Sequence, residues 1–198
     1  NQELEQFLIW FNTPRNELDH LDLVIKAGIT HLWFVTIHPF DDGNGRLTRA
    51  ITERVLAQSD ESHQRFYSMS AQIIKQRNDY YKILERTQKG DTNITQWLVW
   101  FLQTLEQALL SAIETTDKIV NKAKFWQIHR EKPLNARQVK MLNLLLTDFY
   151  GKLTTKKWAA MRKCSVDTAL RDINDLVEKG MLKKSKASGR STSYEVAL

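Results

Sequence analysis

Twelve consecutive residues near the start of the chain, 38–49, combine the side-chain types that phosphate chemistry uses. They read His-Pro-Phe-Asp-Asp-Gly-Asn-Gly-Arg-Leu-Thr-Arg. Because Gly43 and Gly45 flank an asparagine, the backbone can take positive φ there and point several N–H groups into one concavity, a nest for an anion. A helix expected from about Arg46 adds its positive N-terminal end. Arg46 and Arg49 are three residues apart and can face the same side of that helix.

Two further side chains in this segment could take part in a reaction. Asp42 is a hard oxygen ligand beside the nest, which suits a Mg²⁺ ion that also touches phosphates. His38 can carry a proton at neutral pH. The segment therefore predicts a phosphate cradle with a metal ligand and a general base.

The same segment resembles in full the signature of Fic-domain proteins, His-x-Phe-x-(Asp/Glu)-Gly-Asn-Gly-Arg-x-x-Arg. Eight fixed positions in one run make this a specific signal. The resemblance implies an enzyme that transfers AMP from ATP, with Mg²⁺, to a Ser, Thr or Tyr hydroxyl of a target protein.

The resemblance also implies a role for each motif residue. His38 would take the proton from the target hydroxyl, Asp42 would bind Mg²⁺ on the phosphates, and Phe40 would anchor the loop to the core. The phosphates themselves would be held by Gly43, Asn44 and Gly45 as the nest, with Arg46 and Arg49 on the outer phosphates.

A second segment, 77–81, is similar to the family stretch that lines the nucleotide side of the cleft. Asn78 and Tyr81 are therefore candidates for contact with adenine or ribose. Packing alone is an equally open reading for the tyrosines. Two other histidines, His20 and His31, are expected on the helix that precedes the motif, bonded to partners or at the surface rather than catalytic. His63 is expected in an exposed connection.

Composition places the chain among globular proteins without a membrane span. It has 198 residues, of which 42% are hydrophobic and 26% charged, and a single cysteine, Cys164. One cysteine excludes an internal disulfide and suits a reducing compartment. No apolar run is long enough for a membrane span, and no signal peptide is visible. A cytoplasmic protein with no membrane partner is expected.

The charge is unevenly distributed along the sequence. Residues 133–198 hold 13 Lys and Arg against six Asp and Glu, whereas the rest of the chain is slightly acidic. This difference predicts two modules with different partners.

Apolar spacing predicts a mainly α fold. The expected architecture is an all-helical Fic-like core over 1–120, a helical linker over 121–133, and a small domain over 134–198. The helices of the core are expected at 2–11, about 16–37, 44–57, 70–88 with Ser70 as a cap, and from about Trp97 toward Trp126. Gly28 is expected to allow a close helix crossing.

The small domain is predicted to contain three helices and a β-hairpin. The helices are expected after Asn135 and over 156–162 and 166–179, and the strands at 181–184 and 192–196. This is the winged helix-turn-helix pattern, and it resembles the C-terminal domain of many bacterial Fic proteins.

DNA and a second copy of the chain are both candidate partners for this domain. The hairpin residues that could contact DNA are basic: Lys183, Lys184, Lys186 and Arg190. Carboxylates on the would-be recognition helix oppose that reading: Asp167, Asp172, Asp175 and Glu178. Dimerisation or regulation through this domain therefore stays open.

Two alternative functions also stay open. One is a DNA- or protein-binding regulator whose core only senses a nucleotide, and the other is removal of AMP from modified proteins in a longer chain. The family's inhibitory motif, (Ser/Thr)-x-x-x-Glu-(Gly/Asn), has no match in this sequence. We expect that motif and the target-docking hairpin upstream of Asn1.

Overall fold

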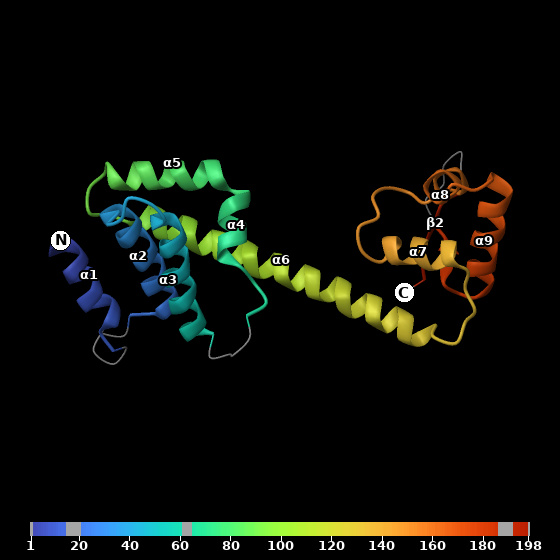
Figure 1. The fold of residues 1–198 in the computed structure, drawn as a ribbon, viewed down its shortest axis with the longest axis horizontal. Helices are drawn as coiled ribbons and strands as arrows, with labels where there is room; N and C mark the ends of the chain where they lie inside the picture. Colours follow the sequence, from blue (N-terminus) through green and yellow to red (C-terminus); the bar gives the residue numbers. More distant parts are fainter. Residues whose placement is uncertain (1, 15–20, 61–64, 186–191, 198) are drawn as a thin grey trace. The chain divides into compact units, whose positions relative to one another are not determined.

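The computed structural model describes residues 2–14, 21–60, 65–185 and 192–197. These residues form a mainly α-helical fold, as predicted, which divides into two compact units at residues 1–113 and 114–198 (Figure 1). The longest helix, α6, crosses this division. Each unit is described here by itself.

The described residues of unit 1 form five helices and the first part of a sixth. In chain order they are α1 Gln2–Asn12, α2 Leu23–Ile37, α3 Asn44–Ser59, α4 Met69–Lys75, α5 Arg77–Gln88 and α6 Thr95–Ile128.

Helix α2 is the central element of unit 1. Its residues are buried on several faces, which matches the apolar character expected of a central helix. A Cβ added to Gly28 would lie 3.0 Å from Leu98 Cδ2 and 3.2 Å from Phe101 Cδ1 of α6. The indole N–H of Trp97 donates to the Gly28 carbonyl at 2.8 Å. The predicted close helix crossing at Gly28 is therefore confirmed, because a side chain there would press against the side chains of Leu98 and Phe101 on α6.

The predicted start of α2 near Asn16 lies outside the described residues, but Leu21 and Asp22, which were predicted to be helical, are not. The helix begins at Leu23, because the Asp22 carboxylate accepts from the N–H groups of Val24 (2.7 Å) and Ile25 (3.4 Å) and caps it. The predicted His20 lies outside the described residues, as does His63.

The single helix predicted over 70–88 is also wrong. Gln76, at φ −108° and ψ 30°, separates α4 from α5. The cap of α4 is Ser68, whose hydroxyl accepts from Ala71 N–H at 3.1 Å. The predicted cap, Ser70, instead donates its backbone N–H to the Glu53 carboxylate at 3.1 Å. The apolar period alone could not show this break, since it continues across Gln76.

In the part of unit 2 that the structure describes lie the end of α6, three helices and two short paired strands. They are α7 Ala136–Leu145, α8 Thr155–Arg162, α9 Val166–Glu178, β1 Leu182–Lys184 and β2 Tyr194–Val196. The strands pair antiparallel with Lys183 opposite Glu195, and Leu153 forms one further bridge to Tyr194.

The core of unit 2 gathers residues from all of these elements. Trp158 of α8, Ile173 of α9 and Met181 before β1 are fully buried, and Phe125 of α6 joins them. Side chains cap all three helices: Asn135 caps α7, Thr154 caps α8 and Ser165 caps α9. The three helices and the hairpin are thus present, while the assignment to the winged helix-turn-helix class stays a prediction.

Candidate functional site

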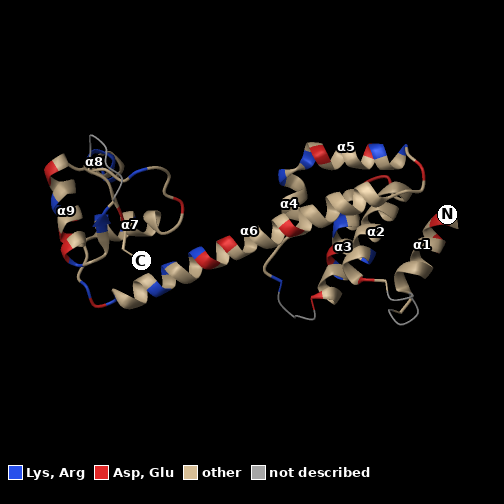
Figure 2. Cartoon of the chain, turned by 180° about the vertical axis from the view of Figure 1, so that it is seen from behind, with Lys and Arg blue, Asp and Glu red and all other residues tan. Residues whose placement is uncertain are grey.

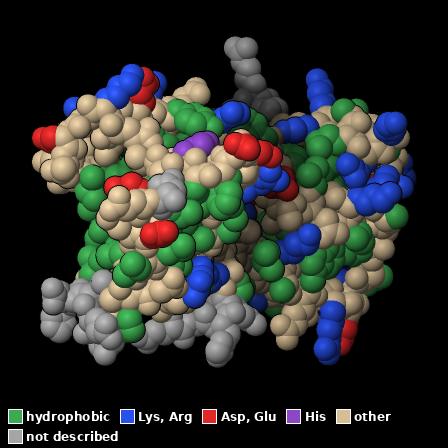
Figure 3. All heavy atoms as spheres, turned by 60° about the vertical axis from the view of Figure 1, so that its left-hand side comes forward, with side chains coloured by type: hydrophobic (Ala, Val, Ile, Leu, Met, Phe, Trp, Pro, Cys, Tyr) green, Lys and Arg blue, Asp and Glu red, His purple; other side chains and the backbone are tan. Residues whose placement is uncertain are grey.

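The site begins where α2 ends. His38 occupies the C-cap with φ 48° and ψ 55°, in the left-handed region, and its N–H donates to Phe34 O at 3.2 Å. This conformation is uncommon for a residue with a Cβ and turns the chain sharply out of the helix. Among the described histidines His38 is the exposed one, and a histidine side chain is visible at the surface in Figure 3.

Asn44 holds the loop in a way that the sequence did not indicate. Its side chain is buried, at 2% exposure, and bonds both polar groups of one peptide residue, Phe40. The Oδ1 atom accepts from Phe40 N–H at 3.0 Å, and Nδ2 donates to Phe40 O. A side-chain amide carries both a donor and an acceptor, which this pairing requires. Asn44 therefore fixes the loop through its side chain, so only its backbone N–H remains for the predicted nest.

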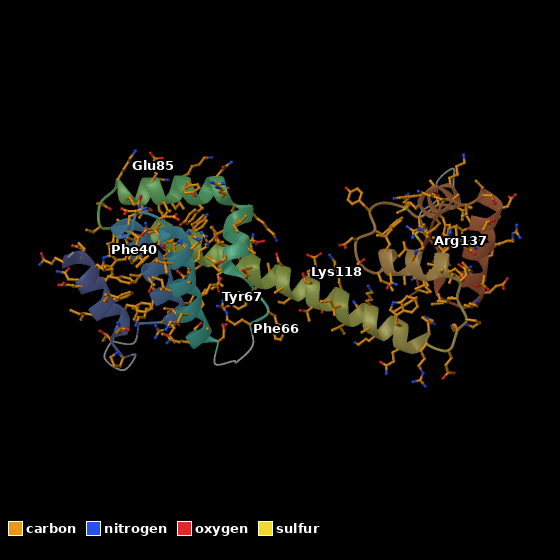
Figure 4. The ribbon with its side chains drawn as sticks, in the orientation of Figure 1. Phe40, Phe66, Tyr67, Glu85, Lys118 and Arg137 are labelled. Carbon is orange, nitrogen blue, oxygen red and sulfur yellow. The ribbon has the colours of Figure 1, made fainter. Side chains whose placement is uncertain are left out.

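Phe40 differs from the predicted core anchor. Its side chain is 48% exposed, and its ring centroid lies 6.5 Å from that of Phe34 (Figure 4). The loop is thus anchored through the backbone of Phe40 rather than through its ring.

The N-terminus of α3 is free of a side-chain cap among the described residues. Its N-cap is Gly43, at φ 86°, with no side-chain hydrogen bond. The first bond of the helix joins Leu47 N–H to Gly43 O at 3.0 Å. The N–H groups of Asn44, Gly45 and Arg46 therefore have no acceptor within the helix. They are available to an anion, and the helix dipole favours one there.

Two arginine side chains lie against the glycines of this turn. A Cβ added to Gly43 would be 3.5 Å from Arg46 Nη2, and one added to Gly45 would be 3.5 Å from Arg49 Nη1. The structure therefore brings together the predicted phosphate ligands on one turn. Guanidinium groups suit phosphate because they offer several N–H donors in a fixed plane.

Asp42 lies at the exposed edge of the turn. Its Oδ1 accepts from Gly43 N–H at 2.7 Å, and its Oδ2 pairs with Arg46 Nη2 at 2.9 Å. The side chains of this pair are 90% and 74% exposed, so the pair contributes little to stability and can exchange partners.

This carboxylate fits the predicted Mg²⁺ ion in its chemistry. Mg²⁺ is commonly bound by one or two carboxylates together with substrate phosphates and water. No group of three or more His, Cys, Asp or Glu side chains that could hold a metal occurs in the described parts of the chain. A magnesium ion at Asp42 would therefore be held with the phosphates rather than by a protein cage.

The candidate contacts for adenine or ribose, Asn78 and Tyr81, are exposed near the start of α5. The Arg77 guanidinium lies 5.6 Å from the Tyr81 ring centroid. Neighbouring Tyr80 is different, since it is buried and its hydroxyl lies 3.0 Å from His31 Nε2. Packing is thus the role of Tyr80, and nucleotide contact by Asn78 and Tyr81 stays a prediction.

His31 is bonded to partners, as predicted. Its ring is fully buried, with Nδ1 3.1 Å from Thr52 Oγ1 and Nε2 3.0 Å from Tyr80 OH. Burial, and secondarily the charge of Arg49, lower the pKa of His31 to about 3. Burial also raises the pKa of Tyr80 to about 12. The charge of Arg49 acts on both rings, so Arg49 lies between the phosphate turn and this buried pair.

The carboxylates predicted to oppose DNA are not all on the surface. Asp172 is only 6% exposed, and its two oxygens bond Asn135 Nδ2 and the guanidinium of Arg137 at 2.8 to 3.0 Å. Arg137 is labelled in Figure 4. The expectation that the Asp172 carboxylate faces outward is therefore wrong, because it bonds α7 across the interior.

The predicted hairpin contacts can be placed only in part. Lys183 and Lys184 are exposed on β1, and Lys183 Nζ lies 3.6 Å from Glu195. Lys186 and Arg190 lie outside the described residues.

Comparison with known proteins bears on the first part of the chain. Residues 1–56 match the model of the Fic/DOC family. The chain is also similar to the protein adenylyltransferase Fic of Drosophila yakuba, with 32% identity over 88 residues. That match covers 44% of this chain and 16% of the relative, so the chain spans a small part of that protein's length. The phosphate turn lies inside the matched residues. None of the described helices is long and apolar enough to cross a membrane.

Replacing Asn44 by Asp should open the phosphate turn. A carboxylate cannot donate to the Phe40 carbonyl, so two acceptors would face each other in a buried place. We expect the free energy of unfolding to fall by about 1–3 kcal/mol, measured by urea denaturation. Asp41→Asn is the matched control, since it exchanges the same two side chains at an exposed neighbouring position and should be close to neutral. Equal effects of the two changes would contradict the role given to Asn44.

The buried His31 should make the stability of the chain depend on pH. Its folded pKa of about 3 lies below its ordinary value of 6.5, so the unfolded state takes up the proton first as the pH falls. Its stabilising contribution is complete above pH 6.5 and is lost toward pH 3. Between pH 7 and pH 5 we expect the wild type to lose about 2 kcal/mol more than His31→Gln, measured by denaturation at each pH. Parallel pH profiles for the two proteins would contradict the buried, neutral state.

Proposed function

We propose that this chain transfers AMP from ATP to a hydroxyl group of a target protein. The observation that supports it best is the uncapped N-terminus of α3, clamped by Asn44 and flanked by Arg46 and Arg49. Three free N–H groups and two guanidinium groups on one turn form an arrangement suited to a polyphosphate. The match of residues 1–56 to the Fic/DOC family agrees with this chemistry.

In the proposed reaction, the target oxygen forms a bond to the α-phosphorus of ATP and the bond to the pyrophosphate oxygen breaks. His38, exposed where α2 ends, accepts the proton of the attacking hydroxyl. The turn N–H groups and the arginines stabilise the charge that develops on the transferring group and on pyrophosphate. Asp42 would hold Mg²⁺, which neutralises phosphate charge when it is bound.

Replacing His38 should abolish transfer without removing ATP binding. His38→Asn is the preferred variant, because asparagine tolerates the left-handed backbone of this position but cannot accept the proton. Purified chain and variant would be incubated with cell lysate, Mg²⁺ and ATP labelled at the α-phosphate. We expect protein-bound label to fall by about 10²–10⁴-fold in the variant.

The same assay separates the alternative functions. Full labelling by His38→Asn would contradict His38 as the base. ATP binding without any label from the wild type would favour a nucleotide-sensing regulator. With proteins that were labelled with AMP beforehand, loss of that label on addition of the chain would favour the removal reaction.

A second candidate function belongs to unit 2, for which we propose contact with the phosphate backbone of DNA. The observation in its favour is that two acids on α9 are paired within the unit, one of them buried. Asp172 is buried against Arg137, and Asp175 Oδ2 bonds Gln138 Nε2 at 2.7 Å and Lys179 Nζ at 2.6 Å.

These pairings change the charge that α9 presents to solvent. Both acidic and basic residues occur along α9 in Figure 2, but exposure leaves Asp167 and Glu178 as the outward acids against Arg171. Exposed lysines on neighbouring elements, such as Lys163 and Lys184, then make the net charge of this surface of unit 2 positive. Such a surface binds phosphates without reading sequence.

Substitution of these lysines should reduce the salt dependence of DNA binding. We expect Lys163→Ala and Lys184→Ala each to lower the slope of log K against log salt by about 0.9, measured by fluorescence anisotropy with a short duplex. Lys118→Ala is the control, since Lys118 pairs with Glu114 on α6. Absence of binding at about 50 mM salt would remove this candidate, and a concentration-dependent mass in sedimentation would then favour dimerisation.

A further inference from the structure

A buried histidine lies two helical turns before the proposed base. His31 precedes His38 by seven residues on α2, which is about 10 Å along the helix. It is fully buried, and the proposed transfer makes no use of it. Both of its ring nitrogens nevertheless have polar partners, on two other helices, α3 and α5.

The directions of these hydrogen bonds follow from the number of protons available. Thr52 has one hydroxyl proton, and it donates this proton to Thr48 O at 2.7 Å. The Thr52 oxygen therefore accepts from His31 Nδ1–H at 3.1 Å. His31 Nε2 is then left with its lone pair, which accepts from the Tyr80 hydroxyl at 3.0 Å. The neutral ring with its proton on Nδ1 satisfies all of these bonds and uses the Tyr80 hydroxyl as the donor to Nε2.

The chain of hydrogen bonds continues to the phosphate turn. The Thr48 hydroxyl donates to Asn44 O at 2.8 Å, and the Asn44 side chain clamps Phe40. Polar contacts thus link Tyr80, His31 and Thr52 directly, and the same residues of α3, Thr48 and Asn44, carry the next bonds toward the loop through different groups. Thr48 and Thr52 are 0% and 1% exposed, so water does not compete for these bonds.

We propose that His31 is a positioning residue that sets α2, which ends at His38, in register with α3, which begins at the phosphate turn. Hydrophobic contacts between two helices hold them together but are not directional. A bond from His31 to Thr52 is directional, and sliding of one helix along the other would leave two buried polar groups unpaired. The catalytic meaning of this inference rests on the proposed function, whereas the register itself does not.

The surroundings of His31 support a neutral ring. The Trp97 ring of α6 lies with its centroid 5.4 Å away, and the Tyr80 ring of α5 meets it edge-on at 5.6 Å. Burial and the charge of Arg49 on α3 lower its pKa to about 3. A second proton would convert the acceptor Nε2 into a donor, so the Tyr80 oxygen would have to accept and its hydroxyl proton would need another partner in this buried place.

The test compares the same substitution at two buried threonines of unit 1. Thr52→Val removes the hydroxyl in the series, and Thr104→Val removes a hydroxyl that also donates to a carbonyl four residues earlier but is not connected to the loop. Both threonines are 1% exposed. The readout is hydrogen exchange of the Phe40 amide, with the buried indole N–H of Trp97 as an internal reference.

We expect the Phe40 amide to exchange about tenfold faster in Thr52→Val and at the wild-type rate in Thr104→Val, relative to the reference. An unchanged Phe40 rate in Thr52→Val would overturn the inference. An equal acceleration in both variants would also overturn it, since the effect would then be a general loss of stability.

Rescue by a conservative variant separates positioning from packing. His31→Gln can donate and accept and should keep the Phe40 exchange rate within about twofold, whereas His31→Leu should not. The affinity for ATP with Mg²⁺ is measured on the same proteins, and it should fall with Phe40 protection. If the wild type binds no ATP, the proposed function fails, but the exchange rates still decide whether His31 sets the loop. Equal exchange rates in the Gln and Leu variants would overturn the positioning role.

Discussion

The arrangement of the phosphate turn depends on one pairing, that of the Asn44 side-chain amide with the backbone of Phe40. The pairing closes the loop over four residues and places Gly43 at the start of α3 with its N–H neighbours uncapped. Without it, the two glycines of the turn would leave the loop with many accessible conformations. The guanidinium groups of Arg46 and Arg49 lie beside this turn, so their position depends on the same clamp.

The phosphate turn is held in place by the packing of unit 1. Helix α2 supplies His38 and is held against α6 by the close approach at Gly28, while α3 supplies the turn. The exposed charged side chains of the site can change partners at a small cost in free energy, because an ion pair as exposed as Asp42–Arg46 contributes little to stability. The rigid part of the site is therefore buried and neutral, and the part that would meet a ligand is exposed and charged.

Much of this organisation could be predicted from sequence. The mainly helical fold and the helix after the motif follow from residues that are close together in the sequence. Gly28 indicated a close helix crossing, but the sequence did not show that the partner is α6. The gathering of Gly43, Gly45, Arg46 and Arg49 was also predictable, since they lie within seven residues of one another.

Contacts between distant residues were beyond the reach of sequence reasoning. The burial of Asp172 against Arg137 joins residues 35 apart, and the bond of His31 to Tyr80 joins residues 49 apart. The start of α2 at Asp22 and the break at Gln76 were missed because the apolar period continues across both positions. The pairing of Asn44 with Phe40 is local, but the family resemblance predicted only a phosphate-binding role for Asn44 and not this role of its side chain.

The left-handed backbone of His38 has a consequence for how this site could change. For a residue with a Cβ this conformation costs about 1–2 kcal/mol, and glycine adopts it without that cost. Selection for thermal stability alone would therefore favour glycine at the position that the proposed chemistry needs as histidine. Directed evolution toward a more stable chain is thus expected to replace His38, the proposed general base, before other residues of the site, unless activity is selected together with stability.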